Sequence, residues 1–130
     1  MFADIAFLLY VGHLIADYGL QTDHQAGHKA GPGRKGWVAN LTHTATHVTV
    51  CGLLLALGTA VLGWRLPVLP ALAALLWIGA THAVIDRRWP VRWWMTHTGS
   101  TDWFTRGGAA HVDQTAHIAA LVVAALCLSA

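Results

Sequence analysis

The sequence contains no glutamate, and only 11% of its 130 residues are charged, whereas 55% are hydrophobic. In ordinary soluble proteins about a quarter of the residues carry a charge, so this composition excludes that class. The length suits one domain, and we predict a single transmembrane domain over residues 1–130.

Several common site types are also missing. The two cysteines, Cys51 and Cys127, lie in apolar segments without a Cys-x-x-Cys spacing, which argues against a thiolate metal site or an iron–sulfur cluster. The glycines of residues 27–36 match no nucleotide-binding fingerprint and follow no predicted strand. No serine or cysteine nucleophile is recognisable, and we expect no nucleic-acid partner.

Long apolar runs are abundant in the sequence. A helix needs roughly 20 mostly apolar residues to cross about 30 Å of hydrocarbon. Four runs meet this requirement, at about residues 2–21, 38–62, 69–86 and 109–129. We therefore predict an all-α, integral membrane four-helix bundle. The first run has no Lys or Arg at its amino end, so we expect a permanent span and not a cleaved signal peptide.

Basic residues are concentrated in two of the three connections between these spans. A basic loop is expected at residues 23–37, and an interfacial segment rich in Arg and Trp at residues 87–108, whereas the remaining connection offers only Arg65. Because Lys and Arg are retained on the cytoplasmic side, we expect both basic segments in the cytoplasm and both termini outside it. Membrane lipids are the expected partners, and a chain of this size is compatible with a homodimer.

Each predicted span carries one pair of ligand-type side chains at positions i and i+4. The pairs are His13 and Asp17, His43 and His47, His82 and Asp86, and Asp113 and His117. This spacing places both members of a pair on one helix face, a turn apart. In an antiparallel bundle all four pairs lie toward the cytoplasmic end. An ionised Asp facing lipid costs about 2.5 to 3.5 kcal/mol, so we expect the pairs to face inward and converge.

We expect the converging side chains to form two adjacent layers, one nearer the cytoplasm (Asp17, His43, Asp86, Asp113) and one a turn deeper (His13, His47, His82, His117). Such constellations bind paired metal ions in four-helix bundles. Mixed His and Asp ligands predict one or two divalent ions, zinc first, with manganese or iron as alternatives. Neighbouring polar residues are expected to orient the ligands: Gln21, Thr42, Thr46, Thr81, Gln114 and Thr115.

The segments GHLIADYGLQTD, THAVID and DQTAH, together with the His-x-x-x-His helix, resemble an uncharacterised bacterial and phage membrane family known as "domain of unknown function 3307". That family shares an amino-terminal His-x-x-x-Asp followed by Leu-Gln-Thr-Asp, and a late Asp-Gln-x-x-His. The resemblance covers nearly the whole chain and implies a bacterial inner (plasma) membrane protein, without implying an activity. The Thr-His pieces are also similar to metal-dependent hydrolases of the inner membrane, which implies hydrolysis.

Two ions that share Asp carboxylates lower the pKa of bound water and hold both oxygens of a hydrolytic displacement. We therefore expect a metal-dependent hydrolase that acts on a lipid or another phosphate-containing amphiphile. Arg87, Arg88 or Arg92 would attract the negative charge of this substrate, and Asp113 or Asp23 would act as general base.

Three other functions remain open at this point. A non-catalytic metal transporter or sensor would use the same ligands, but it needs a path through the apolar outer half of the bundle. A b-type haem protein would use the histidines as axial ligands, but it gains nothing from an Asp one turn away. A structural membrane interaction protein would tolerate the loss of these residues one at a time.

Overall fold

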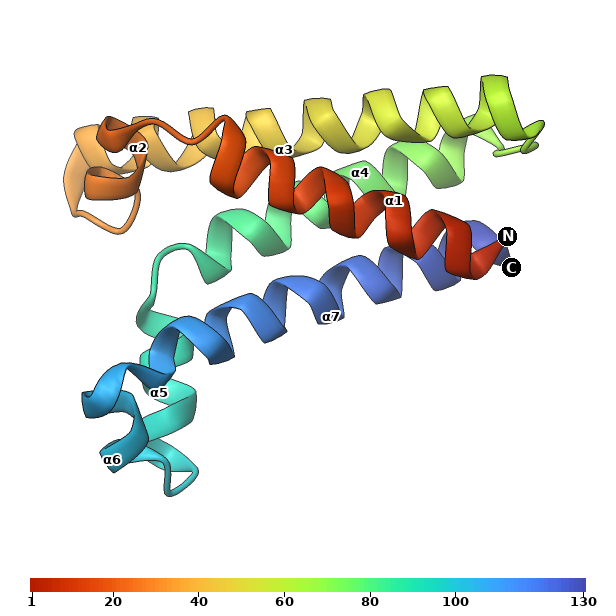
Figure 1. The fold of residues 1–130 in the computed structure, drawn as a ribbon. Helices are drawn as coiled ribbons and strands as arrows, with labels where there is room; N and C mark the ends of the chain where they lie inside the picture. The colour runs from red at the N-terminus through yellow and green to blue at the C-terminus, as the bar shows by residue number, and fades with distance from the viewer.

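The computed structural model consists of helices and short connections, without a strand. Figure 1 shows its four long helices as a bundle: α1 (Phe2–Leu14), α3 (Gly33–Leu62), α4 (Val68–Ile85) and α7 (Ala109–Ser129). α1 and α4 each pack against both α3 and α7, so the four helices form a ring of antiparallel neighbours. The predicted all-α bundle is confirmed.

Four helical segments are long and apolar enough to cross a membrane: Phe2–Gly19, Gly33–Leu62, Val68–Ile85 and Thr101–Ser129. The first and third match the predicted runs closely, and the fourth begins at Thr101, although its long α-helix α7 begins at Ala109 as predicted. The helix expected to begin near Val38 begins earlier, at Gly33, so the end of the predicted basic loop is helical.

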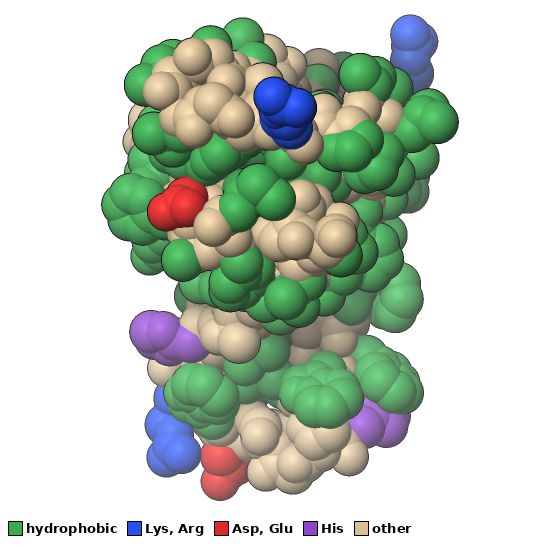
Figure 2. All heavy atoms as spheres, turned by 90° about the vertical axis from the view of Figure 1, so that its right-hand side faces the viewer, with side chains coloured by type: hydrophobic (Ala, Val, Ile, Leu, Met, Phe, Trp, Pro, Cys, Tyr) green, Lys and Arg blue, Asp and Glu red, His purple; other side chains and the backbone are tan.

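The two basic segments lie at the same end of the bundle, opposite both chain termini (Figure 1). One contains α2 (Asp23–His28), and the other contains α5 (Trp89–His97), α6 (Thr101–Trp103) and a π-helical turn at Phe104–Gly108. Figure 2 views the bundle from the end that carries the termini, where apolar side chains predominate and charged ones are isolated.

The helix α2 lies within residues 23–37, where the sequence predicts a basic loop. Its amino end is held by a capping box, in which the Gln25 backbone N–H donates to Thr22 Oγ1 at 3.2 Å and the Thr22 N–H donates to Gln25 Oε1 at 2.9 Å. Two donors that a helix end leaves unpaired are satisfied in this way. The Thr-x-x-Gln spacing was the sequence signal for this helix.

The end of α1 departs from regular α-helix geometry. Residues Ile15–Gly19 form a π-helical turn, and the Leu20 N–H donates to the Ile15 carbonyl at 3.0 Å. Such turns insert an extra residue and are frequent at functional sites. Asp17 lies within this turn, and its Oδ2 lies 3.2 Å from His13 Nε2, as the i, i+4 spacing predicts.

Apolar and polar residues occupy different halves of the bundle interior. The apolar core comes from the beginning of α1 and α4 and the end of α3 and α7, which lie toward the termini; its members include Ile5, Leu9, Leu55, Ile78, Leu121 and Leu128. The buried histidines and carboxylates lie in the other half. The interior is therefore closed by apolar packing on the side of the termini.

Two glycines of α3 provide a test of this core packing. A Cβ atom at Gly58 would overlap the indole ring of Trp64, whereas a Cβ at Gly52 would lie 3.5 Å from Leu75 Cδ1, an ordinary contact. We expect Gly58→Ala to lower the free energy of unfolding by about 1 to 3 kcal/mol, as overpacking usually does. Gly52→Ala should be neutral or slightly stabilising. Thermal unfolding in detergent measures both, and equal midpoints would contradict this packing.

Candidate metal centre

Five imidazoles and two carboxylates converge in the half of the bundle nearer α2 and α5. The seven residues come from all four long helices and their ends: His13, Asp17, His43, His47, His82, Asp86 and His117. The five histidines and Asp86 are buried, and the Asp17 side chain is 7% exposed. In every contact with a carboxylate, the imidazole uses its Nε2 atom, so the five rings direct the same atom toward one space.

Asp17 connects three of the helices. Its Oδ1 lies 3.1 Å from the Nε2 atoms of both His43 and His47, and its Oδ2 lies 3.2 Å from His13 Nε2. The Gln114 amide donates to Asp17 Oδ2 at 3.1 Å, and Gln114 Oε1 lies 3.0 Å from His13 Nε2. Gln114 therefore orients two ligand-type side chains at once, the role expected for it from the sequence.

Asp86 is the second carboxylate of the cluster. Its Oδ2 lies 3.1 Å from His82 Nε2 and 3.6 Å from His43 Nε2, and its Oδ1 lies 3.6 Å from His117 Nε2. Asp113 extends the cluster at its edge, with Oδ2 at 3.5 Å from His117 Nε2 and a side chain 24% exposed. All eight side chains expected to be metal ligands therefore belong to one connected group.

The two expected layers interlock instead of remaining separate. Asp17 contacts both His43 and His47, which the one-turn spacing assigns to different layers. The His82 ring lies at the centre, with its centroid 3.7 Å from that of His47 and 4.3 Å from that of His117.

Three sets of these side chains could hold a metal ion, and within each set the ligand atoms lie within 4.8 Å of one another. They are Asp17, His43, His47 and His82; His13, His82 and His117; and Asp86, Asp113 and His117. Nitrogen and carboxylate oxygen donors in this mixture suit zinc and neighbouring divalent metals.

Two buried atoms at the centre, His82 Nε2 and Asp86 Oδ2, make no hydrogen bond of acceptable geometry, either with each other or with another group. A buried polar atom without a hydrogen bond lowers the stability of the fold by about 1 to 3 kcal/mol. Both atoms are of the kind that coordinates a cation, and they lie 3.1 Å apart. A metal ion bound between them would satisfy both, so the residues present fit such an ion.

Lys29 enters the same cluster from the segment that follows α2. Its ammonium Nζ lies 3.0 Å from Asp86 Oδ1 and 3.1 Å from His43 Nε2, and its side chain is only 12% exposed. Arg87 anchors the backbone here, because its guanidinium donates to the Lys29 carbonyl at 2.9 Å and to the Gly31 carbonyl at 2.8 Å. Sequence reasoning missed this role of Lys29, which no helical spacing could have indicated.

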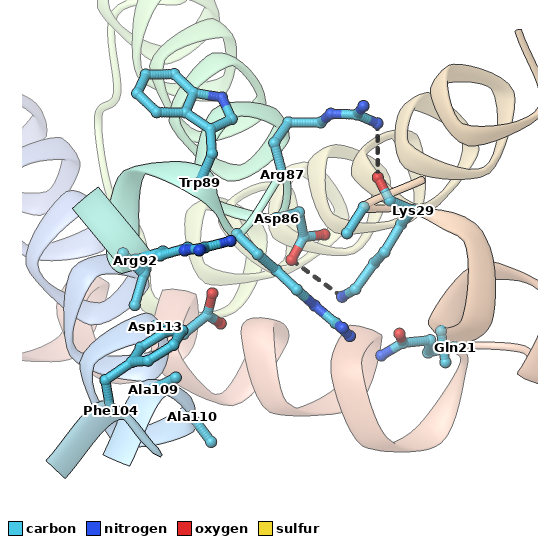
Figure 3. Close-up of a pocket in the computed structure, with 14 residues that line it drawn as sticks. Gln21, Lys29, Asp86, Arg87, Trp89, Arg92, Phe104, Ala109, Ala110 and Asp113 are labelled. Atoms are coloured by element: carbon cyan, nitrogen blue, oxygen red, sulfur yellow. Dashed lines mark hydrogen bonds and ion pairs between the residues drawn. The ribbon is translucent and has the colours of Figure 1, made fainter. Parts of the chain in front are cut away.

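A cavity of about 710 Å³ opens beside the cluster at the basic end of the bundle. Figure 3 shows Asp86, Asp113, Lys29 and Arg92 pointing into it. Arg87 and Arg88 also line the cavity. The rest of the wall consists mainly of apolar side chains, including Trp89, Val91 and Phe104. The cavity is therefore lined both by carboxylates of the cluster and by cationic side chains.

Comparison with known proteins places the chain in a family. The family model described as "Protein of unknown function (DUF3307)" matches residues 5–130. The chain belongs to this family. The match includes every residue of the cluster and of the cavity wall. No curated protein and no solved structure matches the chain.

The DUF3307 chain keeps other sequence-selected residues away from the cluster. Asp23, expected as a candidate general base, is exposed at the start of α2 and makes no contact with the converging side chains. The hydroxyls expected to orient ligands instead donate to carbonyls of their own helices, at Thr42, Thr46, Thr81 and Thr115. Gln21 donates to the Asp17 carbonyl at 3.0 Å, so it supports the backbone and not the carboxylate.

Proposed function

We propose that the chain is an integral membrane protein whose divalent metal centre hydrolyses an anionic amphiphile. The observation that carries this proposal is the position of Asp86, which belongs to the histidine cluster and also lines the cavity with cationic walls. Ligands suited to a metal ion and groups suited to an anionic headgroup are therefore adjacent.

The surface of the long helices supports insertion into a membrane. Large apolar side chains point outward along α3 and α4, including Leu53 at 66% exposure and Leu76 at 74%. Extended apolar surface of this kind is rare on soluble monomers. Both basic segments lie at one end, so the positive-inside rule favours an orientation with that end in the cytoplasm and both termini outside it. The membrane that we propose is the bacterial inner membrane.

The centre would hold one or two divalent ions, zinc first, with manganese or iron as alternatives. An ion bound there would polarise a substrate oxygen and lower the pKa of water. Asp113 is suited to accept the proton of the attacking water, because it lies at the boundary between cluster and cavity and is partly exposed.

The arginines of the cavity differ in their availability. Arg87 is engaged with two backbone carbonyls and lies over the Trp37 ring, 4.5 Å from its centroid. The exposed side chains of Arg88 and Arg92 form no hydrogen bond or ion pair. One guanidinium group can donate two parallel hydrogen bonds to two oxygens of a phosphate, so these two arginines favour a phosphate headgroup. A lipid phosphate is the substrate class that we propose.

Two alternatives gain less support. A transporter needs a polar path, but the half of the bundle beyond the cluster is filled by the apolar core. A haem needs an open slot between its axial imidazoles, whereas the His82 ring packs against those of His47 and His117.

Hydrolysis can be tested on purified protein in detergent, loaded with zinc or manganese. We expect release of inorganic phosphate from a long-chain alkyl phosphate, or of a phosphate-bearing headgroup from a diacyl phospholipid. An uncharged alkyl ester should remain intact, and removal of the metal with a chelator should stop the reaction. Metal-loaded protein that turns over neither phosphate substrate would contradict the proposed hydrolase.

A further inference from the structure

We propose that Lys29 takes the place of a second cation, so that the centre holds one divalent metal ion beside the lysine ammonium. This inference rests on the proposed metal centre and specifies its composition. The Lys29 ammonium is already within 3.0 Å of Asp86 Oδ1 and 3.1 Å of His43 Nε2, two atoms of the cluster.

The charges of the cluster favour a single ion. Three carboxylates, Asp17, Asp86 and Asp113, face one ammonium, so two negative charges remain when the imidazoles are neutral. One divalent ion balances this remainder. Two divalent ions would leave two uncompensated positive charges in a buried site, and buried charges are costly unless they are paired.

The arrangement of ligands also separates the two cations. Asp17, His43, His47 and His82 form a four-ligand set, the number that zinc prefers. An ion in that set would use the lone pair of His43 Nε2 and would be next to Asp86 Oδ2, which lies 3.1 Å from His82 Nε2 and 3.6 Å from His43 Nε2. The Lys29 ammonium retains the other oxygen, Asp86 Oδ1. Asp86 also belongs to the set that a second ion would need.

The structure holds Lys29 in this position. Arg87 donates two hydrogen bonds to the Lys29 and Gly31 carbonyls, which fixes the backbone on both sides of Ala30. Gly36 allows this segment to approach α3, because a Cβ atom at that position would overlap the Gly31 carbonyl. The lysine is therefore a built part of the cluster and not a mobile loop charge.

The test counts the metal ions bound per chain in detergent-purified full-length protein, saturated with zinc and then desalted, by mass spectrometry of the elements. We expect one ion in the wild-type protein and about two in Lys29→Met, a twofold rise, because Asp86 Oδ1 loses the ammonium beside it and the set Asp86, Asp113 and His117 becomes free for a second ion. Lys29→Arg keeps the charge and should bind one ion. Lys35→Met is the matched control, since Lys35 is exposed on α3 and contacts no cluster residue.

Two results would overturn the inference: two ions in the wild-type protein, or one ion in both Lys29→Met and Lys29→Gln. The neutral Gln variant serves if the Met variant does not fold, and the wild-type count is decisive in either case. A wild-type protein without bound metal would instead refute the metal centre itself. Absence of hydrolysis with one ion bound would refute the hydrolase and leave the role of Lys29 intact.

Discussion

Replacing His82 with alanine should abolish metal binding. His82 is the central imidazole of the cluster, and it belongs to two of the three ligand sets, the one with His47 and the one with His13. Its Nε2 atom is buried and without a hydrogen-bond partner, so a bound ion gains more from this ligand than from one already satisfied. Asp86→Ala should have the same effect, because it removes the carboxylate 3.1 Å from that nitrogen.

The measurement is the metal content of detergent-purified protein, with wild type and Trp94→Phe as controls. Trp94 is 57% exposed on α5, and its replacement by another aromatic residue should leave the metal content unchanged. Helical content from circular dichroism separates loss of the ion from loss of the fold. Full metal occupancy in folded His82→Ala and Asp86→Ala would rule out the cluster as the binding site.

The convergence of the site could be predicted because two constraints act together. The apolar runs specify antiparallel helices, and a carboxylate in such a helix must avoid lipid. Each pair therefore faces inward near the basic end, and the structure brings all eight of these side chains into one group. This prediction did not require exact helix boundaries, because a pair at positions i and i+4, such as His43 and His47, lies on one face of its helix wherever the helix begins.

Other features depend on contacts between segments distant in the sequence. Lys29 meets Asp86 only because the turn after α2 folds back over the cluster and is held there by Arg87. The π-helical turn at Ile15–Gly19 likewise has no sequence signature, although it contains Asp17, the carboxylate that contacts both His43 and His47. The spacing of the ligands therefore predicted which residues belong to the cluster, but not which of them contact one another.

Contacts and backbone conformation also distinguish Arg87 from Arg88, two adjacent arginines that look equivalent in the sequence. Arg87 is a structural anchor, whereas Arg88 lies in the left-handed region with φ 63° and contributes to the cavity wall. For a residue with a side chain this conformation costs about 1 to 2 kcal/mol. Strain that persists at a cavity is often associated with function, and Arg88 lines the same cavity as Asp86 and Asp113.

Replacing Arg88 with glycine should therefore change stability and activity in opposite directions. Glycine adopts a positive φ without strain, so the free energy of unfolding should rise by about 1 kcal/mol. A lost charged hydrogen bond to phosphate is worth about 1.5 to 3 kcal/mol, which corresponds to a fall in kcat/KM of about 10- to 100-fold. Thermal unfolding and hydrolysis of a long-chain alkyl phosphate are measured on the same metal-loaded sample.

Arg106→Ala provides the matched control for the loss of one positive charge at this end of the bundle. Arg106 is exposed in the π-helical turn before α7 and does not line the cavity, so its replacement should leave kcat/KM within about twofold of wild type. If both variants lose activity equally, the arginines attract substrate only through the general field of the surface. If Arg88→Gly is more stable and fully active, Arg88 does not bind the phosphate. If Arg88→Gly is more stable but less active, unfolding cannot explain the loss of activity. That result would place the headgroup beside Asp86 and Asp113.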